Sequence, residues 1–142
     1  MFYQLAAGAA VSASNIVIHA LIMAVVLRVT RLVSAKTSWH PWLLLIAVMC
    51  ATVSVLMLAH ACEVIVWSVA YAIVGAAPAG TDLVYFAFVN YTTLGYGDVV
   101  PVEAWRLLGP MTAMNGVLLF GWSTAVIFEV LRRAMLKNDM LG

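Results

Sequence analysis

The chain has 142 residues, of which 65% are hydrophobic and only 9% are charged, and its formal net charge is +1. A soluble domain of this size cannot bury so much apolar surface, so the composition excludes an ordinary soluble protein and indicates an integral membrane protein. The small net charge also excludes the basic surface that binding to nucleic acid requires.

The first apolar run covers residues 5–27. As a helix it is ~34 Å long, which is enough to cross a hydrocarbon layer of ~30 Å. Arg28, Arg31 and Lys36 follow it, and such basic residues favour the cytoplasmic side, so the N-terminus is expected outside. At a helix end they indicate interface anchors rather than a voltage sensor. Residues 1–36 are thus predicted to form a transmembrane helix and a basic cytoplasmic loop.

One face of this first helix carries small and polar residues. Gly8, Ser12, Asn15 and His19 follow one another at spacings of four, three and four residues. Such a stripe usually packs one membrane helix against another, so we expect it to dock this helix onto the rest of the chain. Proton sensing by His19 is the functional alternative.

The second apolar run predicts an outer helix over residues 42–74. It is longer than the membrane is thick, so it should tilt or project. Trp39 and Trp42 at one end, and Trp67 and Tyr71 at the other, have the spacing of aromatic residues at the two membrane interfaces.

Two ionisable residues, His60 and Glu63, lie three positions apart within this second helix. An ionisable residue inside a membrane span indicates a functional site or a buried hydrogen bond. They do not predict a metal site, because zinc requires more ligands and His19 and His40 are expected at other depths.

A break and a short helix follow. Residues 75–80 contain Pro78 and end the outer helix, and Thr81 is the expected N-cap of a helix over residues 82–92. That helix is only ~16 Å long, so it should re-enter the membrane rather than cross it. Its C-terminal end would point the negative end of the helix dipole toward a cation at the membrane centre.

The next residues predict an ion selectivity filter over residues 93–98, directly after Thr92. Its sequence is Thr93, Leu94, Gly95, Tyr96, Gly97 and Asp98. A dehydrating cation needs a ring of oxygens, and backbone carbonyls supply it if consecutive residues point theirs at one axis. Gly95 and Gly97 can adopt positive φ at little cost, which allows such a conformation.

Side chains are expected to complete this filter. The Thr93 hydroxyl would add one more oxygen at the inner end, the Tyr96 ring would brace the filter, and Asp98 would close the outer mouth.

The third crossing is predicted as an inner helix over residues 105–135, and further basic residues lie at its end: Arg132, Arg133 and Lys137. Every Lys and Arg except Arg106 then falls on one side of the membrane, which predicts three transmembrane helices with the C-terminus in the cytoplasm.

Residues 93–98 are similar to the Thr-x-Gly-Tyr-Gly-Asp signature of potassium channels. The ten residues before Thr92 resemble that family's pore helix, and residues 99–101 resemble its exit from the filter. The resemblance runs from about residue 78 to about residue 136, whereas residues 1–35 have no counterpart in a minimal two-helix pore.

The resemblance implies an all-α integral membrane fold in which residues 37–142 form a pore domain. One chain supplies one pore loop, so the resemblance implies a homotetramer in a prokaryotic plasma membrane, surrounded by lipid. The expected function is passive, potassium-selective conduction without catalytic residues or a cofactor. Potassium ions would bind at Thr93, Leu94, Gly95 and Tyr96, with Gly97 completing the filter. A weakly selective cation channel and a non-conducting accessory subunit remain alternatives.

Further residues are expected to support this pore. Tyr85 and Phe86 stand where many members carry two tryptophans, and Val89 stands where some carry a glutamate. We therefore expect Asp98, Tyr85, Glu63 and Thr92 to support the filter. Tyr85 and Thr81 are the expected hydrogen-bond donors to Glu63, with His60 as a competitor.

The inner helix is expected to supply the pore cavity. By the resemblance, Thr112 and Asn115 should line a water-filled cavity and Gly116 should act as a hinge, whereas Gly109 and Gly121 should be close-packing points. Because the pore appears complete without the first helix, a chain starting near Thr37 is expected still to form tetramers.

Overall fold

The structure, a computed structural model, describes residues 1–36 and 40–139. The side chains of Arg31, Pro41, and residues 33–36 and 137–139 are also outside the described part. Trp39 and the side chains of Lys36 and Lys137, on which the sequence analysis drew, therefore lie outside it. The elements are α1 (Phe2–Lys36), α2 (Pro41–Val74), α3 (Leu83–Tyr91), η1 (Glu103–Trp105) and α4 (Leu108–Asp139).

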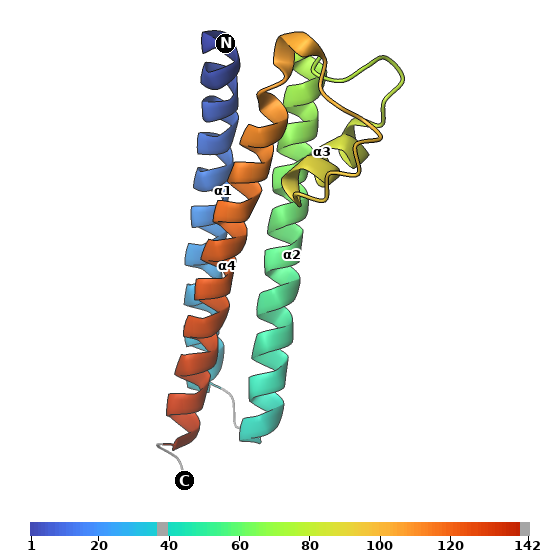
Figure 1. The fold of residues 1–142 in the computed structure, drawn as a ribbon. Coiled ribbons are helices and arrows are strands. Elements are labelled where there is room, and N and C mark those ends of the chain that lie inside the picture. Colours follow the sequence, from blue (N-terminus) through green and yellow to red (C-terminus); the bar gives the residue numbers. More distant parts are fainter. Residues whose placement is uncertain (37–39, 140–142) are drawn as a thin grey trace.

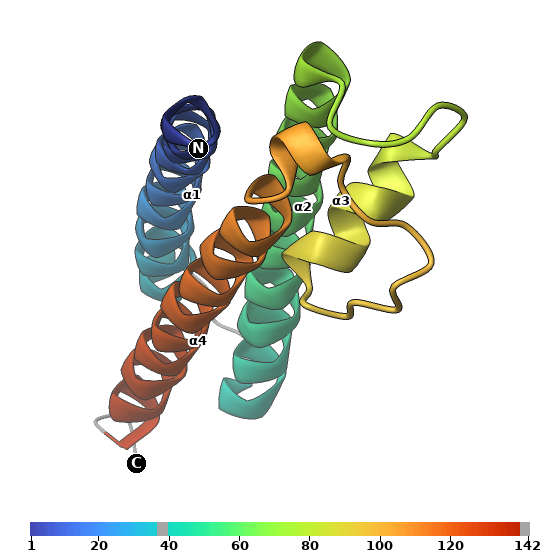
Figure 2. The same ribbon diagram turned by 45° about the horizontal axis from the view of Figure 1, so that its top comes forward.

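Three long helices form the body of the protomer, and the short α3 lies at one side of it (Figures 1 and 2). Helices α1, α2 and α4 are each long and apolar enough to cross a membrane. Helix α1 contacts α2 and α4, and α3 contacts the same two helices from another side. The first residue lies at the end of the body where α4 begins, and α4 ends at the opposite end (Figure 1). The predicted fold class, an all-helical membrane protein with a short helix between spans, is confirmed.

Two helix starts differ from the predictions. Asp82, not Thr81, is the N-cap of α3, because its Oδ1 accepts hydrogen bonds from the backbone N–H groups of Val84 and Tyr85 at 3.0 and 3.1 Å. Helix α4 begins at Leu108 rather than at residue 105, after the single turn η1. There the N–H of Leu107 donates to Gln4 Oε1 of α1 at 3.1 Å, so a side chain of another helix satisfies the backbone before α4 starts.

The main core lies where α3 meets α2 and the start of α4. Its buried residues are Val64, Trp67, Tyr71, Ala76, Phe86, Ala87, Tyr91 and Leu108. The placement of Trp67 and Tyr71 at a membrane interface was wrong, since both side chains are fully buried. Their polar atoms have partners inside the protein: Trp67 donates to Asn115 at 3.0 Å, and Tyr71 bonds to Thr112 at 2.5 Å.

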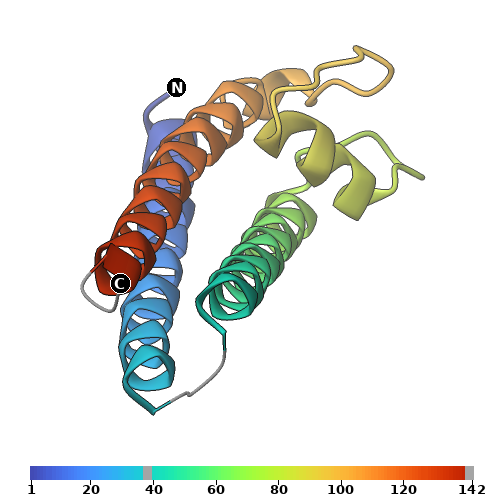
Figure 3. The same cartoon turned by 90° about the horizontal axis from the view of Figure 1, so that it is seen from below.

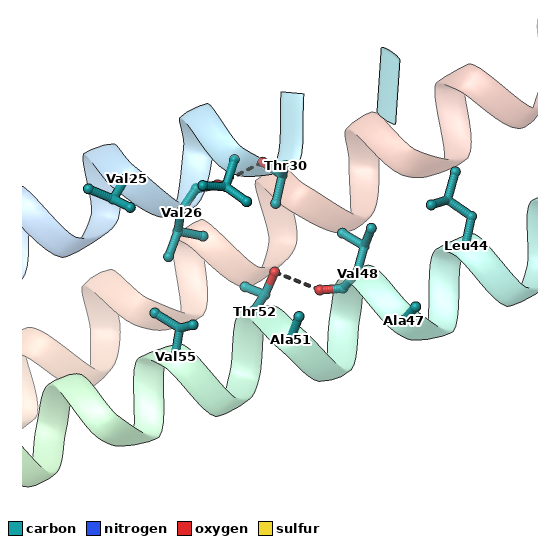
Figure 4. A pocket seen from close by; sticks show the side chains of 10 residues that line it. Val25, Val26, Thr30, Leu44, Ala47, Val48, Ala51, Thr52 and Val55 are labelled. Atoms are coloured by element: carbon teal, nitrogen blue, oxygen red, sulfur yellow. Dashed lines mark hydrogen bonds between the residues drawn. The ribbon is translucent and has the colours of Figure 1, made fainter. Parts of the chain in front are cut away.

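A second, purely apolar cluster holds the other half of the protomer. It contains Met23, Val26, Val48, Leu56, Val126 and Val130. Beside it, a cavity of about 360 Å³ lies between α1 and α2, which stand apart from each other at this end (Figures 3 and 4). Its two threonines present little polarity, because Thr52 donates to the Val48 carbonyl at 2.8 Å and Thr30 to the Val26 carbonyl at 3.0 Å.

Candidate functional site

The segment after α3 is fixed by hydrogen bonds to the last carbonyls of that helix. The N–H of Thr93 donates to the Asn90 carbonyl at 3.1 Å. The N–H groups of Leu94 and Gly95 both donate to the Val89 carbonyl, at 3.0 and 3.5 Å. The end of α3 therefore determines where the predicted filter begins.

The backbone of this segment adopts positive φ at every second residue. The φ angles are 60° at Thr93, 58° at Gly95 and 78° at Gly97. Both glycines therefore adopt the conformation expected of them. Thr93 was not expected to do so, and in the described residues it is the one non-glycine with positive φ. Such a conformation costs roughly 1–3 kcal/mol and is often found where function requires it.

All the residues from Thr92 to Asp98 are exposed in the single chain. The Tyr96 side chain is 70% exposed, so within its own chain this ring braces nothing. The Thr92 hydroxyl, although exposed, donates to the Phe88 carbonyl at 2.7 Å and so caps the end of α3.

The outer end of the segment is tied to the start of α3. Tyr85 donates a hydrogen bond to Asp98 Oδ2 at 2.6 Å. The Asp98 carboxylate raises the pKa of Tyr85, because accepting this hydrogen bond favours the protonated phenol. Tyr85 thus supports Asp98 and not Glu63, which corrects the partner expected for Glu63.

A buried polar cluster lies behind α3 and is centred on Glu63. His19 Nδ1 lies 2.7 Å from Glu63 Oε1, and His60 Nδ1 lies 2.9 Å from Oε2. The hydroxyl of Tyr91 donates to the same Oε2. Neither Tyr85 nor Thr81 bonds to Glu63, because the C-terminal end of α3, and not its start, faces this part of α2. The prediction that His19 lies at another depth was also wrong.

Ser123 of α4 closes the other side of this cluster. Its Oγ lies 2.9 Å from His60 Nε2 and 3.3 Å from His19 Nε2. We call His19, His60, Glu63, Tyr91 and Ser123 the Glu63 cluster, and it joins all four α-helices. The sequence analysis missed Tyr91 and Ser123. The position of Tyr91 at the end of the short helix was the available signal, whereas Ser123 gave none.

A second polar contact lies next to the Glu63 cluster. Asn15 Nδ2 donates to Asn115 Oδ1 at 3.1 Å and to the Glu63 carbonyl at 3.2 Å. Thr112 and Asn115 are therefore buried against α1 and α2, whereas the sequence analysis placed them on a cavity. The Thr112 hydroxyl bonds to Tyr71, and the Asn115 side-chain oxygen accepts from Trp67. Turning either side chain toward a cavity would leave these buried groups unpaired, which is costly.

Gly116 is the point at which α4 approaches α3 most tightly. A Cβ at this position would overlap the carbonyl oxygen of Tyr91. The structure thus gives Gly116 a packing role, and its role as a hinge stays a prediction. Gly109 also lies close to α3, with a Cβ position 3.4 Å from Asn90 Oδ1, as predicted. At Gly121 a Cβ would meet nothing within 4 Å in this chain, so close packing is not observed there.

Replacing Gly116 by alanine is expected to destabilise the protein. Alanine favours a helix over glycine by up to ~1 kcal/mol, but forcing apart two packed backbones costs roughly 1–3 kcal/mol or more. We expect a lower melting temperature in detergent for Gly116→Ala, measured by circular dichroism. The matched control, Gly121→Ala, has open space and should melt like the parent or slightly above it. Equal melting of both variants would contradict the packing role.

The stripe on α1 docks this helix as predicted. Asn15 and His19 are fully buried, and a Cβ at Gly8 would overlap the side chain of Met111 on α4. Near the start of the same helix, the hydroxyl of Tyr3 donates to the Ala104 carbonyl at 3.1 Å. Helix α1 therefore contacts the connection into α4 as well as the Glu63 cluster.

The arrangement defines a class of membrane protein: long crossing helices with a short helix and an irregular segment held between two of them. A protein family described as "Ion channel" matches residues 59–133, which is more than half of the chain. The chain therefore belongs to this ion channel family and carries an ion channel pore domain, so it is not an enzyme. No curated protein and no solved structure matches the chain. The family match begins within α2, so α1 lies outside it.

Proposed function

We propose that the chain is one subunit of a potassium-selective channel whose filter is residues 93–98. The observation that carries the proposal is the positive φ at Thr93, Gly95 and Gly97 in a segment attached to the end of α3. Turning alternate residues into the left-handed region brings successive carbonyls toward one side, which a carbonyl-lined ion path requires. Potassium ions would bind to the carbonyls of Thr93, Leu94, Gly95 and Tyr96, with Gly97 above them.

The proposal includes assembly into a homotetramer. A carbonyl ring cannot be made by one pore loop, and the loop of a single chain leaves Leu94 54% and Tyr96 70% exposed. Burying these side chains against neighbouring subunits explains why apolar and aromatic residues occupy the segment. Residues 37–142 would form the pore domain, and residues 1–36 an additional transmembrane helix that packs on it.

The orientation in the membrane is part of the same proposal. Arg28 on α1 and Arg132 and Arg133 on α4 lie toward the end of the body opposite the first residue, which the positive-inside rule places in the cytoplasm. The N-terminus and the outer filter would then face outside. A prokaryotic plasma membrane fits a small channel subunit of this kind.

The test is the reversal potential of the purified protein in a planar bilayer with unequal potassium and sodium on the two sides. We expect it to follow the potassium gradient. A reversal potential that follows both cations equally would show a weakly selective cation channel instead. Absence of current at every voltage and pH tested, from protein that is folded and assembled, would favour the accessory subunit. Either result would overturn potassium selectivity.

A further inference from the structure

The Glu63 cluster concentrates metal-binding side chains that the proposed potassium path does not use. Nitrogen and oxygen atoms of His19, His60 and Glu63 lie within 4.8 Å of one another. His19 and Glu63 are fully buried, and His60 is 15% exposed. An ionised carboxylate buried inside a membrane span requires a compensating positive charge. A cation at this position would supply it.

Counting hydrogens in the cluster shows that one of its close contacts lacks a hydrogen. Each histidine faces the Glu63 carboxylate with Nδ1 and the Ser123 hydroxyl with Nε2. A neutral histidine has one N–H, the ionised carboxylate only accepts, and the Tyr91 hydroxyl donates to Glu63, so both Nδ1 atoms must carry the hydrogen. Both Nε2 atoms then require a donor, but Ser123 has one hydroxyl hydrogen. One of the two contacts at Ser123 is left without a hydrogen.

We propose that a divalent transition-metal ion, with Zn²⁺ the best fit, binds in the Glu63 cluster through His19 Nδ1, His60 Nδ1, Glu63 and the Tyr91 oxygen. The imidazole and oxygen ligands suit zinc, which is most often four-coordinate. Tyr91 is placed for the fourth position, because its hydroxyl lies 2.9 Å from His60 Nδ1 and also contacts Glu63.

Metal binding would supply a hydrogen to both contacts at Ser123. With Nδ1 on the metal, each neutral histidine carries its hydrogen on Nε2, and the two Nε2–H groups donate to the two lone pairs of Ser123. Such an outer hydrogen bond usually fixes the orientation of a metal-bound histidine. The Glu63 carboxylate would compensate part of the charge of the ion, and Tyr91 would contribute an oxygen lone pair while keeping its hydrogen bond to Glu63.

Forming the site requires side chains of the cluster to shift, because the ligand atoms of His19, His60 and Glu63 lie within 4.8 Å of one another and not at one common spacing. Metal–ligand bonds of ~2.0–2.1 Å place the ligand atoms of a tetrahedral site about 3.3 Å apart. The corresponding distances are 2.7 Å between His19 Nδ1 and Glu63 Oε1 and 2.9 Å between His60 Nδ1 and the Tyr91 hydroxyl. Side-chain rotations on three helices can supply the difference. Since Tyr91 is the last residue of α3, the ion would join α1 and α2 to the base of the proposed filter.

The test measures zinc bound to the purified full chain in detergent, after equilibration at micromolar free zinc and removal of the excess. Cys50 and Cys62 are exposed and would bind zinc on their own, so both are first replaced by serine. We expect one ion per chain. His19→Ala and His60→Ala should lose it, whereas His40→Ala, which changes an exposed histidine outside the cluster, should retain it.

Two further measurements keep the result independent of misfolding. Ser123→Ala retains all four ligands and removes only the shared acceptor, so we expect affinity about 10–100-fold lower with the ion still bound at saturation. Co²⁺ in place of zinc should give the visible absorption of a tetrahedral site in the parent, but not in His19→Ala. No bound zinc in the parent, or equal binding by the parent and His19→Ala, would overturn the proposal and show that a proton completes the cluster. Because the readout is binding and not current, its failure is distinct from failure of potassium selectivity.

Discussion

Replacing Gly97 by alanine is expected to abolish potassium selectivity. Gly97 has a φ of 78° and Gly95 a φ of 58°, and a left-handed conformation costs a residue with a Cβ about 1–2 kcal/mol. To avoid that strain the peptide planes would rotate, and their carbonyls would leave the ion path. Gly95→Ala should behave in the same way. Tyr96→Asp should relax selectivity, because it removes the ring that would pack against a neighbouring subunit in the proposed tetramer. The measurement is the ratio of potassium to sodium permeability from reversal potentials.

The chain offers a matched control for backbone strain. Gly80 has a φ of 82°, and a Cβ there would meet nothing within 4 Å, but it lies in the connection between α2 and α3. Gly80→Ala should therefore lower stability by a similar amount and leave permeability unchanged. Parent-like selectivity in Gly95→Ala, Gly97→Ala and Tyr96→Asp together would refute the assignment of the filter.

Replacing Glu63 by alanine is expected to cause the largest loss of stability. The carboxylate contacts His19, His60 and Tyr91 in a buried site, and its removal leaves these polar groups without a partner at about 1–3 kcal/mol each. Glu63→Gln preserves the shape but replaces one acceptor oxygen by a donor amide, so its loss should be smaller. Because Tyr91 ends the helix before the filter, both variants should also shorten channel openings. Thermal melting and single-channel recording are the measurements.

An exposed glutamate provides the control for charge. Glu103 lies on η1 and is exposed, so Glu103→Ala should change the free energy of unfolding by no more than ~0.5 kcal/mol. If Glu63→Ala and Glu63→Gln both melted and gated like Glu103→Ala, the Glu63 cluster would have no role in supporting α3.

The structure changes the context of the prediction about α1. A chain that begins near Thr37 lacks both His19 and Asn15, which contact the Glu63 carboxylate and the Glu63 carbonyl. Its ability to form tetramers stays a prediction. Without α1, however, Glu63 keeps only His60 and Tyr91 as partners, so the pore domain alone should be less stable than the whole chain.

The crossings and the break between them followed from local sequence alone. A run of apolar residues long enough to span the hydrocarbon layer must be helical there, because backbone polar groups have no other partners in lipid. The same holds for positive φ at Gly95 and Gly97, because the need for a residue without a Cβ is local. The signals that end a helix are local as well, and the predicted ends of α2 and α3 lie within one residue of the observed ends.

What local sequence could not decide was which side chains meet across helices. Thr112 and Asn115 were predicted to line a cavity, and Trp67 and Tyr71 to lie at the membrane interface. In the core they instead form two hydrogen-bonded pairs, Trp67 with Asn115 and Tyr71 with Thr112. Thr93 adopts positive φ despite its Cβ, because the bonds to the end of α3 hold it there.

The sequence alone predicted three helices long and apolar enough to cross a membrane, and a glycine-containing segment after a short helix. Only packing between the helices brings His19 of α1 to Glu63 of α2 and Ser123 of α4, and Tyr91 of α3 to Glu63. Helix periodicity gives the face on which a residue lies, but the rotation and depth of each helix depend on packing against its neighbours. For His19, two of those neighbours are Glu63 and Ser123, which lie 44 and 104 positions away in the chain.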